Sequence, residues 1–337
     1  MALRARIAGT GMAVPDRIVT NKDLTEMMDT SEEWIEQRTG IKERRWVEDG
    51  QKPSDLAREA TLAALEQTGL KVDDIDCILL ATLSGEHDFP GTSFFLHEAI
   101  GAGNTPCIDL RAQCSGFLYA LQMADALIVS GHHRRILVVG CEVHSTGLNK
   151  STEGRDVTVI FGDGSGAILL EAVEATDEAN GPGVLGVCLH AEGKNAKRLW
   201  LEGPGSAIPD RITHKMLDEG KHFPQMDGRY VFKHAVTRMP EVLHETLDAT
   251  GTALDDVDLF LFHQANLRIN EFVGQKLEIP ESKMLNNIQR LGNCSAAALP
   301  ILLAEATRSG QLEAGNLVSM TAFGSGFTWG SALVRWG

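Results

Sequence analysis

Cys114 is the residue of this sequence best suited to covalent chemistry. It follows a short apolar stretch at residues 107–110, and after it apolar residues recur at helical spacing, which predicts a strand followed by an amphipathic helix. At the start of a helix, free backbone N–H groups and the positive end of the helix dipole favour a thiolate over a thiol. The alternative is a buried structural cysteine, because free cysteines are among the most buried residues.

Two further side chains could act together with a thiolate. His263 could donate a hydrogen bond or a proton to an oxygen that becomes negative, and Asn293 offers an NH₂ donor that needs no ionisation. A thiolate forms a covalent acyl intermediate with a thioester, and two neutral donors aimed at one oxygen form an oxyanion hole, which contributes about 3 kcal/mol per donor. The alternatives are a core histidine with satisfied hydrogen bonds and an asparagine that caps a helix.

The chain contains an internal repeat that relates these residues. Three pairs of segments match in the same order: 67–80 with 249–262, 114–131 with 293–310, and 166–171 with 330–335. We interpret the matches as a duplicated α/β unit whose two copies pack about a pseudo-two-fold axis. The repeat aligns Asn293 with Cys114 and puts His263 just past a strand of the second copy. Symmetric packing would therefore bring Cys114, His263 and Asn293 to one pocket.

The composition narrows the functional classes. The chain has 337 residues and a net charge of −15, which argues against a nucleic-acid-binding surface. No stretch approaches the ~18 apolar residues of a membrane helix, and the first residues lack the apolar core of a signal peptide. The six cysteines form no CxxC motif and no Cys/His cluster, so the sequence predicts neither a metal site nor a disulfide framework. We therefore expect a cytoplasmic protein without membrane insertion.

Several motifs together resemble one family over nearly the whole chain. They are DTSEEWIEQRTGIKER (29–44), CSGF (114–117), FGDG (161–164), HQANLRI (263–269), GN (292–293) and FTWGSALVR (327–335). With them the chain resembles β-ketoacyl-acyl-carrier-protein synthase III, the initiating condensing enzyme of bacterial fatty acid synthesis. The resemblance implies the thiolase-like α/β fold, a duplicated arrangement of five layers in the order α-β-α-β-α. It also implies a half at 1–172 with the nucleophile, and a remainder at 173–337 with a linker, an insertion and the half that carries the histidine and the asparagine.

The resemblance implies a decarboxylating condensation in two stages, with no cofactor and no metal. Cys114 takes an acyl group from an acyl-CoA. A malonyl thioester on an acyl carrier protein then loses CO₂, while His263 and Asn293 stabilise the enolate. The enolate carbon attacks the acyl-cysteine and gives a β-ketoacyl thioester. The backbone N–H groups of Cys114 and Ser325 would hold the tetrahedral oxyanion.

The resemblance also implies residues that bind substrates and partners. Those for CoA and substrate are Trp34, Arg38, Arg155, Asn266 and Phe89. Trp34 and Arg155 would enclose the CoA adenine, with Arg38 close by. Asn266 would line the pantetheine tunnel. Phe89 would reach the acyl pocket of the partner subunit in a homodimer. The acidic carrier protein would dock on three cations: Lys233, Arg268 and Lys276.

Some residues depart from the usual pattern of this family. Gln113 and Ser325 stand where a small residue and a glycine are usual. Segments such as RAQCSG (111–116) and PGSA (204–207) also resemble the quinolone-signal synthase branch, which condenses an aromatic acyl group with malonyl units. The alternative function is therefore a condensing enzyme of specialised metabolism that uses an aromatic or longer acyl donor. A non-catalytic acyl-binding subunit is a further class, and the retained cysteine argues against it.

Overall fold

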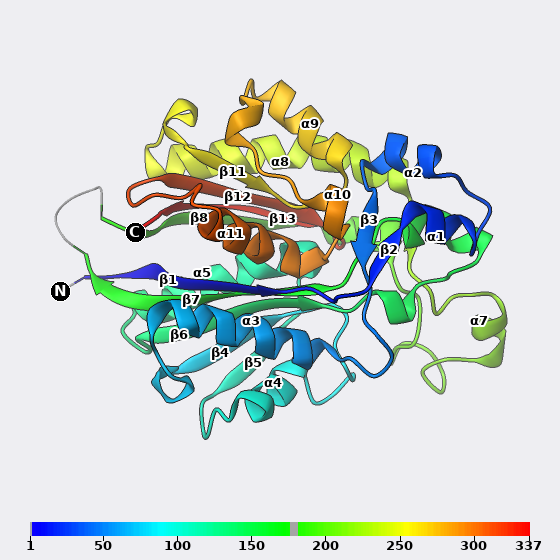
Figure 1. Ribbon diagram of the computed structural model, residues 1–337, viewed down its shortest axis with the longest axis horizontal. Helices are drawn as coiled ribbons and strands as arrows, with labels where there is room; N and C mark the ends of the chain where they lie inside the picture. Colours follow the sequence, from blue (N-terminus) through cyan, green and yellow to red (C-terminus); the bar gives the residue numbers. More distant parts are fainter. Residues whose placement is uncertain (1, 176–180) are drawn as a thin grey trace.

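The computed structural model describes residues 2–175 and 181–337 and arranges them in five layers (Figure 1). From bottom to top in Figure 1 these are a helical layer, a mixed β-sheet, a central helical layer, a second mixed β-sheet and an outer helical layer. This is the α-β-α-β-α order that the sequence predicts. Each sheet is covered by helices on both faces, so its central strands are apolar throughout rather than alternating.

The first sheet has five strands. Its order is β1 (Leu3–Ala13), β7 (Gly164–Glu174), β6 (Arg135–Glu142), β4 (Cys77–Ala81) and β5 (Cys107–Leu110). β4 pairs parallel with β5 and β6, whereas β7 pairs antiparallel with β1 and β6. The parallel strands β4 and β5 therefore end at the same edge of the sheet, and the chain that leaves β5 carries Cys114.

The second sheet repeats this topology. Its order is β11 (Leu259–Phe262), β12 (Leu317–Gly324), β13 (Thr328–Arg335) and β8 (Gly183–Ala191). β11 and β12 are parallel, as β4 and β6 are, and β13 is antiparallel to both of its neighbours, as β7 is. An isolated parallel bridge between Phe260 and Met284 stands where β4 pairs with β5 in the first sheet. The shared topology confirms the predicted duplication. The predicted division at residue 172 stays a prediction, and its linker includes residues 176–180, which lie outside the described residues.

The longer helices form the three helical layers. α5 (Gly116–Val129) and α11 (Ala298–Arg308) lie in the centre, α3 (Pro53–Thr68) and α4 (Thr92–Ile100) cover the first sheet, and α8 (Gly228–Thr250) and α9 (Leu267–Lys276) cover the second. The central helices bury apolar side chains against both sheets, including Phe117, Leu121, Leu299 and Leu302. α3 has Pro53 in its first turn and a left-handed Gly69 after its end.

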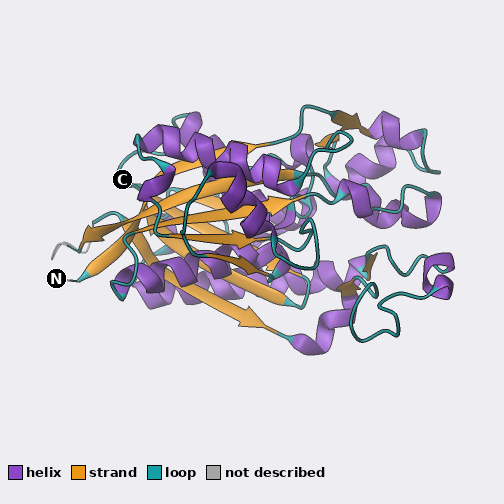
Figure 2. Cartoon of the chain, turned by 90° about the horizontal axis from the view of Figure 1, so that it is seen from below, coloured by secondary structure: helices purple, strands orange, loops and turns teal. Residues whose placement is uncertain are grey.

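Short elements gather at the end of the layers away from the chain termini (Figure 2). They include α1 (Asn21–Thr25), α2 (Glu32–Thr39), α7 (His214–Asp218), β2 (Ile18–Thr20) and β3 (Glu43–Arg45). The other short elements are α6 (Arg155–Thr158), α10 (Ile288–Leu291), β9 (Leu199–Trp200) and β10 (Gln225–Met226). The Ser31 hydroxyl accepts a hydrogen bond from the backbone N–H of Trp34 at 3.1 Å and so caps α2.

The repeat has a different offset at the nucleophile from the one that the sequence predicts. Equivalent 3₁₀ turns precede α5 and α11, and each begins with a left-handed residue, Gln113 (φ 48°) and Ser295 (φ 47°). Their offset is 182 (295 − 113). The sequence alignment, anchored on the Ser-Gly that follows each helix, used 179 (293 − 114), and α11 has 11 residues where α5 has 14. Ala296, and not Asn293, therefore stands at the position of Cys114.

Candidate active site

Cys114 lies at the junction between β5 and α5, as the strand-to-helix pattern predicts. The residue is 6 % exposed. Its turn is packed against the end of β12, where a methyl group added to Gly324 would stand 2.7 Å from Cβ of Cys114 and 3.2 Å from its sulfur. Because glycine has no Cβ, it leaves room for a substrate carbonyl beside that sulfur.

Burial raises the pKa of the Cys114 thiol to about 11. A hydrogen bond from the Ser295 hydroxyl, 3.4 Å from the sulfur, acts in the opposite direction, as do the backbone N–H groups of Ser325 and of Cys114 itself. The loss of hydration outweighs these donors, so the free protein carries a thiol at neutral pH. The prediction that the helix start favours a thiolate is therefore wrong for the resting state.

His263 follows β11 directly, and its backbone N–H donates to the Thr321 carbonyl at 2.8 Å, which fixes it beside β12. The side chain is 2 % exposed, and within the described residues neither ring nitrogen has a hydrogen-bond partner. Burial, with a smaller contribution from His144, lowers the pKa of His263 to about 3. The imidazole is therefore neutral at physiological pH and carries a single N–H donor.

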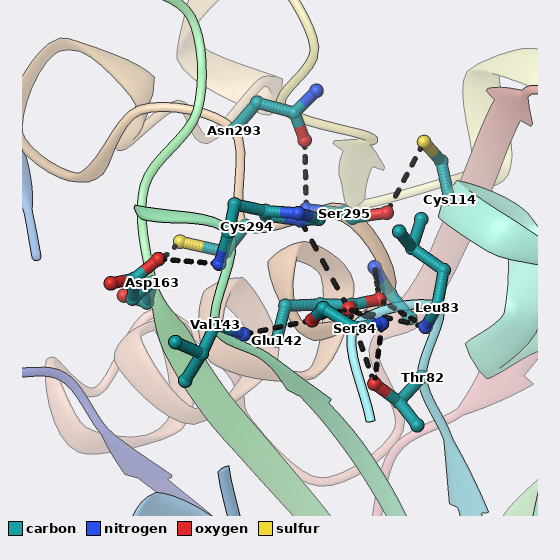
Figure 3. A network of polar contacts seen from close by, with 12 residues as sticks. Thr82, Leu83, Ser84, Cys114, Glu142, Val143, Asp163, Asn293, Cys294 and Ser295 are labelled. Carbon is teal, nitrogen blue, oxygen red and sulfur yellow. Dashed lines mark hydrogen bonds and ion pairs between the residues drawn. The ribbon is translucent and has the colours of Figure 1, made fainter. Parts of the chain in front are cut away.

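Asn293 lies just before the turn that leads into α11. Its backbone N–H donates to the Ile160 carbonyl at 2.9 Å, and its carbonyl accepts from Gly162 at 3.1 Å, so it joins the two halves of the molecule. The side-chain oxygen accepts a hydrogen bond from the backbone N–H of Ser295 at 2.8 Å (Figure 3). Its NH₂ group consequently points away from the turn. The side chain closes a tight turn rather than capping a helix, because the N-cap residues of the 3₁₀ turn and of α11 are Cys294 and Ala297. The expectation of a helix cap is therefore wrong, and a donor role toward substrate stays a prediction.

A cavity of about 440 Å³ brings the three predicted catalytic residues together. Cys114, His263 and Asn293 all line it. Its other walls are largely apolar and include Phe161, Val231, Phe232, Met239, Ile269 and Phe323. In such a lining, a hydrogen bond to a developing negative charge is stronger than it would be in water.

Trp34, Arg38 and Asn266 line the same cavity. The guanidinium carbons of Arg38 and Arg155 lie 4.5 and 4.7 Å from the centre of the Trp34 ring. Arg155 also donates to the Asp29 carbonyl at 2.8 Å. The Asn266 side chain caps α9 and donates to the Arg38 carbonyl at 3.0 Å. Because Arg155 already stacks on the indole, an adenine fits between the two only after the guanidinium has moved.

The other predicted binding residues lie outside this cavity lining. Phe89 is 82 % exposed, in the loop between β4 and α4. Lys233 is exposed on α8, and Arg268 and Lys276 lie on α9. Arg268 pairs with Glu271 at 2.9 Å and donates to backbone oxygens of α2, so α2 and α9 are tied together. The docking roles of these residues stay predictions.

Two polar residues that the sequence motifs do not reveal lie at or beneath the turn that contacts Cys114. Ser295 donates to the sulfur of Cys114, and Glu142, at the end of β6, is fully buried beneath the turn that carries Ser295. Burial raises the pKa of Glu142 to about 7. His144, which the sequence analysis does not assign to the site, has its Nε2 4.0 Å from this carboxylate, and burial lowers its pKa to about 3. An acidic residue directly after a buried apolar run is the signal that could have found Glu142.

Within residues 2–175 and 181–337, no group of three or more His, Cys, Asp and Glu side chains is arranged to hold a metal ion. Over the same residues, no helix has the length and apolar character needed to cross a membrane.

Known proteins are similar to this chain in both sequence and fold. Family profiles described as 3-oxoacyl-[acyl-carrier-protein (ACP)] synthase III and its C-terminal part match residues 108–193 and 247–336. A β-ketoacyl-[acyl-carrier-protein] synthase III of Roseiflexus castenholzii is 41 % identical over 336 residues, which cover 100 % of this chain and 99 % of that protein. The crystal structure of 3-oxoacyl-[acyl-carrier-protein] synthase III from Aquifex aeolicus VF5 is 37 % identical, with a TM-score of 0.88 over 98 % of this chain and 100 % of that one. A β-ketoacyl-[acyl carrier protein] synthase III structure from Thermus thermophilus is 35 % identical, with a TM-score of 0.89 over 98 % and 99 %.

These similarities confirm the predicted thiolase-like fold, and they favour the fatty acid condensing enzyme over the quinolone-signal alternative. The identity extends over the full length of the relatives, so it covers both halves and every segment that lines the cavity. The chain belongs to the β-ketoacyl-[acyl-carrier-protein] synthase III family and is an acyltransferase, a condensing enzyme of fatty acid biosynthesis.

Proposed function

We propose that this cavity performs the condensation in two stages, with Cys114 as the nucleophile. The proposal depends on one observation: a cysteine sulfur, a neutral imidazole without a described partner and an amide NH₂ line one cavity. In the first stage the Cys114 sulfur attacks the thioester carbonyl of an acyl-CoA. The bond between that carbon and the CoA sulfur breaks, and the thiol proton passes to the departing sulfur. The backbone N–H groups of Cys114 and Ser325 donate to the intermediate oxyanion.

In the second stage, a malonyl thioester on an acyl carrier protein loses CO₂, and the electron pair of the broken bond forms an enolate. The N–H of His263 and the NH₂ of Asn293 donate to the enolate oxygen; the low pKa of His263 supports this role because a neutral imidazole does not protonate the enolate carbon. The enolate carbon bonds to the acyl carbonyl, and the Cys114 sulfur leaves and takes a proton from solvent. These steps are acyl transfer and decarboxylation, so the proposal needs no cofactor or metal.

The CoA nucleotide, we propose, binds at the indole of Trp34. The two guanidinium groups within 5 Å of this ring support the assignment, because they supply positive charge beside an aromatic surface. Arg155 moves off the indole to enclose the adenine, and Arg38 faces the phosphates. The pantetheine arm then follows the cavity past Asn266 toward Cys114.

For the carrier protein we propose the exposed surface of α8 and α9, where Lys233, Arg268 and Lys276 offer positive charge on an otherwise acidic chain. We further propose a homodimer in which the exposed Phe89 reaches the acyl pocket of the second copy. The enzyme acts in the cytoplasm without binding nucleic acid or inserting into a membrane. All six cysteines are free within the described residues, which suits a reducing compartment.

Mass spectrometry of the protein incubated with acyl-CoA compounds tests the proposal. The peptide that contains Cys114 should gain the mass of the acyl group, and Cys114→Ala should gain none while keeping its fold. Cys294→Ala is the matched control, because it removes another buried thiol and should leave the adduct intact. A panel of acetyl, longer aliphatic and aromatic donors identifies the preferred acyl group. Absence of an adduct with every donor would overturn the proposal.

A further inference from the structure

Glu142 is a buried carboxylate that the proposed reaction does not use. It is the last residue of β6 and is 0 % exposed. The end of β4 and the residues after it surround the carboxylate with donors (Figure 3). These donors are the hydroxyls of Thr82 and Ser84, at 3.2 and 2.5 Å, and the backbone N–H groups of Leu83 and Ser84, at 3.2 and 3.1 Å.

One more donor reaches Glu142 from the other half of the molecule. The backbone N–H of Ala296 lies 3.4 Å from Oε1 of Glu142. Ala296 directly follows Ser295, whose left-handed backbone (φ 47°) is costly for a residue with a side chain. Such a conformation persists only where the surroundings hold it, and the carboxylate is the charged group in contact with this turn.

The same turn makes two contacts with the site. The hydroxyl of Ser295 donates to the Cys114 sulfur at 3.4 Å, and the backbone N–H of Ser295 donates to the Asn293 side-chain oxygen at 2.8 Å. The turn therefore makes three neighbouring contacts (Figure 3): the Ala296 N–H faces Glu142, the Ser295 hydroxyl faces the Cys114 sulfur, and the Ser295 N–H faces the Asn293 side chain. A displacement of this turn would change the geometry at both reacting positions together.

We propose that Glu142 is a positioning residue: its carboxylate holds the Ser295–Ala296 turn so that the Ser295 hydroxyl donates to the Cys114 sulfur and the Asn293 NH₂ stays aimed into the cavity. This inference rests on the proposed roles of Cys114 and Asn293. A carboxylate suits the place because it only accepts hydrogen bonds, and every contact named above is a donor. Glutamine has nearly the same shape, but its NH₂ group would face one set of these donors.

A double-mutant cycle tests the inference, with alkylation of Cys114 by iodoacetamide at fixed pH as the readout. Ser295→Ala should slow alkylation about tenfold, because it removes a hydrogen bond to the thiolate. Glu142→Gln should slow it about fivefold where Ser295 is present and should not slow it in the Ser295→Ala background, because the effect passes through that hydroxyl. Equal slowing in both backgrounds would overturn the inference.

The negative charge of Glu142 provides an opposing expectation. This charge raises the pKa of the Cys114 thiol, so its removal without any positioning effect would speed alkylation. Faster alkylation of Glu142→Gln with Ser295 in place would therefore also overturn the inference. Glu142→Asp keeps the acceptor and should alkylate faster than Glu142→Gln. If only side-chain volume mattered, glutamine would be the better replacement. Should Glu142→Gln fail to fold, the cycle is run with Glu142→Asp, whose shorter side chain should slow alkylation less than glutamine would and only where Ser295 is present; equal slowing in both backgrounds would again overturn the inference.

Asp163 offers a matched control. It is also fully buried, and its carboxylate accepts from the backbone N–H groups of Val47, His144 and Ser145 rather than from the turn at Ser295. Asp163→Asn and Ser295→Ala should therefore be additive in the same cycle. Alkylation needs no acyl substrate, so the two proposals can fail separately. Coupling between Glu142→Gln and Ser295→Ala without an acyl adduct on Cys114 would refute the proposed function alone. An acyl adduct without this coupling would refute the positioning role alone.

Discussion

Gly324, the last residue of β12, lies directly against Cys114: a methyl group added to it would stand 3.0 Å from the backbone N of the cysteine and 3.2 Å from its sulfur. The two residues come from the two halves of the chain, and in the proposed reaction the substrate carbonyl approaches the sulfur where they meet. The side of the nucleophile that faces the second sheet is therefore kept open by the absence of a side chain.

Gly324→Ala should reduce acylation of Cys114 about 100-fold, because the new methyl group displaces the sulfur or fills the place of the substrate carbonyl. The measurement is single-turnover acylation followed by mass spectrometry. Gly193→Ala is a control in which the added methyl group meets open space, and its acylation rate should match that of the wild type. An unchanged rate for Gly324→Ala would contradict the close contact between Gly324 and Cys114.

His263→Ala should leave acylation within about threefold of the wild type and slow condensation by about 100- to 1,000-fold, because it removes one donor to the enolate oxygen. The two half-reactions are measured separately, by acyl adduct formation and by product release from the preformed acyl-enzyme. His144→Ala removes another buried imidazole outside the cavity lining and should not change the ratio of the two rates. A loss of acylation in His263→Ala would instead assign this residue to activation of the thiol.

Trp34→Ala should raise the KM for acyl-CoA about tenfold and leave kcat nearly unchanged, because in the proposed binding mode the indole contacts the nucleotide and not the reacting atoms. The same acyl group on pantetheine, which lacks the nucleotide, should show no difference between variant and wild type. Arg155→Ala should follow the same pattern. Equal losses with both donors would mean that Trp34 supports the shape of the cavity rather than the nucleotide.

Stability should fall in acid because His144 and His263 are buried in the neutral form. Burial lowers both pKa values from 6.5 to about 3, so between these pH values the unfolded chain binds more protons than the folded one. Each histidine then reduces the free energy of unfolding by up to about 1.4 kcal/mol per pH unit as the pH falls. Glu142 acts in the opposite direction: its pKa is raised to about 7, so its contribution is present below pH 4.5 and is lost as the pH rises through 7.

Urea unfolding at several pH values between 7 and 4 isolates one of these histidines. His144→Leu should show a shallower loss of unfolding free energy below pH 6.5 than the wild type, since one buried proton acceptor is gone. The contribution of Glu142 is common to both proteins and largely cancels in the comparison. Parallel curves for the two proteins would show that His144 is not held neutral by burial.

Features that depend on short-range periodicity and on residue type were predictable from the amino-acid sequence alone. The strand-to-helix junction at Cys114 follows from spacings within about twenty residues, whereas the duplication follows from matching segments about 180 residues apart. The residue types able to form an acyl intermediate and an oxyanion hole were equally visible. The repeat was nevertheless misaligned at Cys114. The Ser-Gly after each helix set the alignment, and because α5 and α11 differ in length, it paired Cys114 with Asn293 instead of Ala296.

The protonation states and contacts of these residues depend on how the two halves of the chain pack in three dimensions. Cys114 and Ser295 are 181 residues apart in the chain, yet their contact belongs to one turn of the site, and the carboxylate of Glu142 supports that turn from a third segment. The thiol rather than thiolate state of Cys114 and the neutral state of His263 arise from burial between two sheets. Hydration and long-range contacts depend on how the two halves pack, and no local spacing in the sequence encodes that packing.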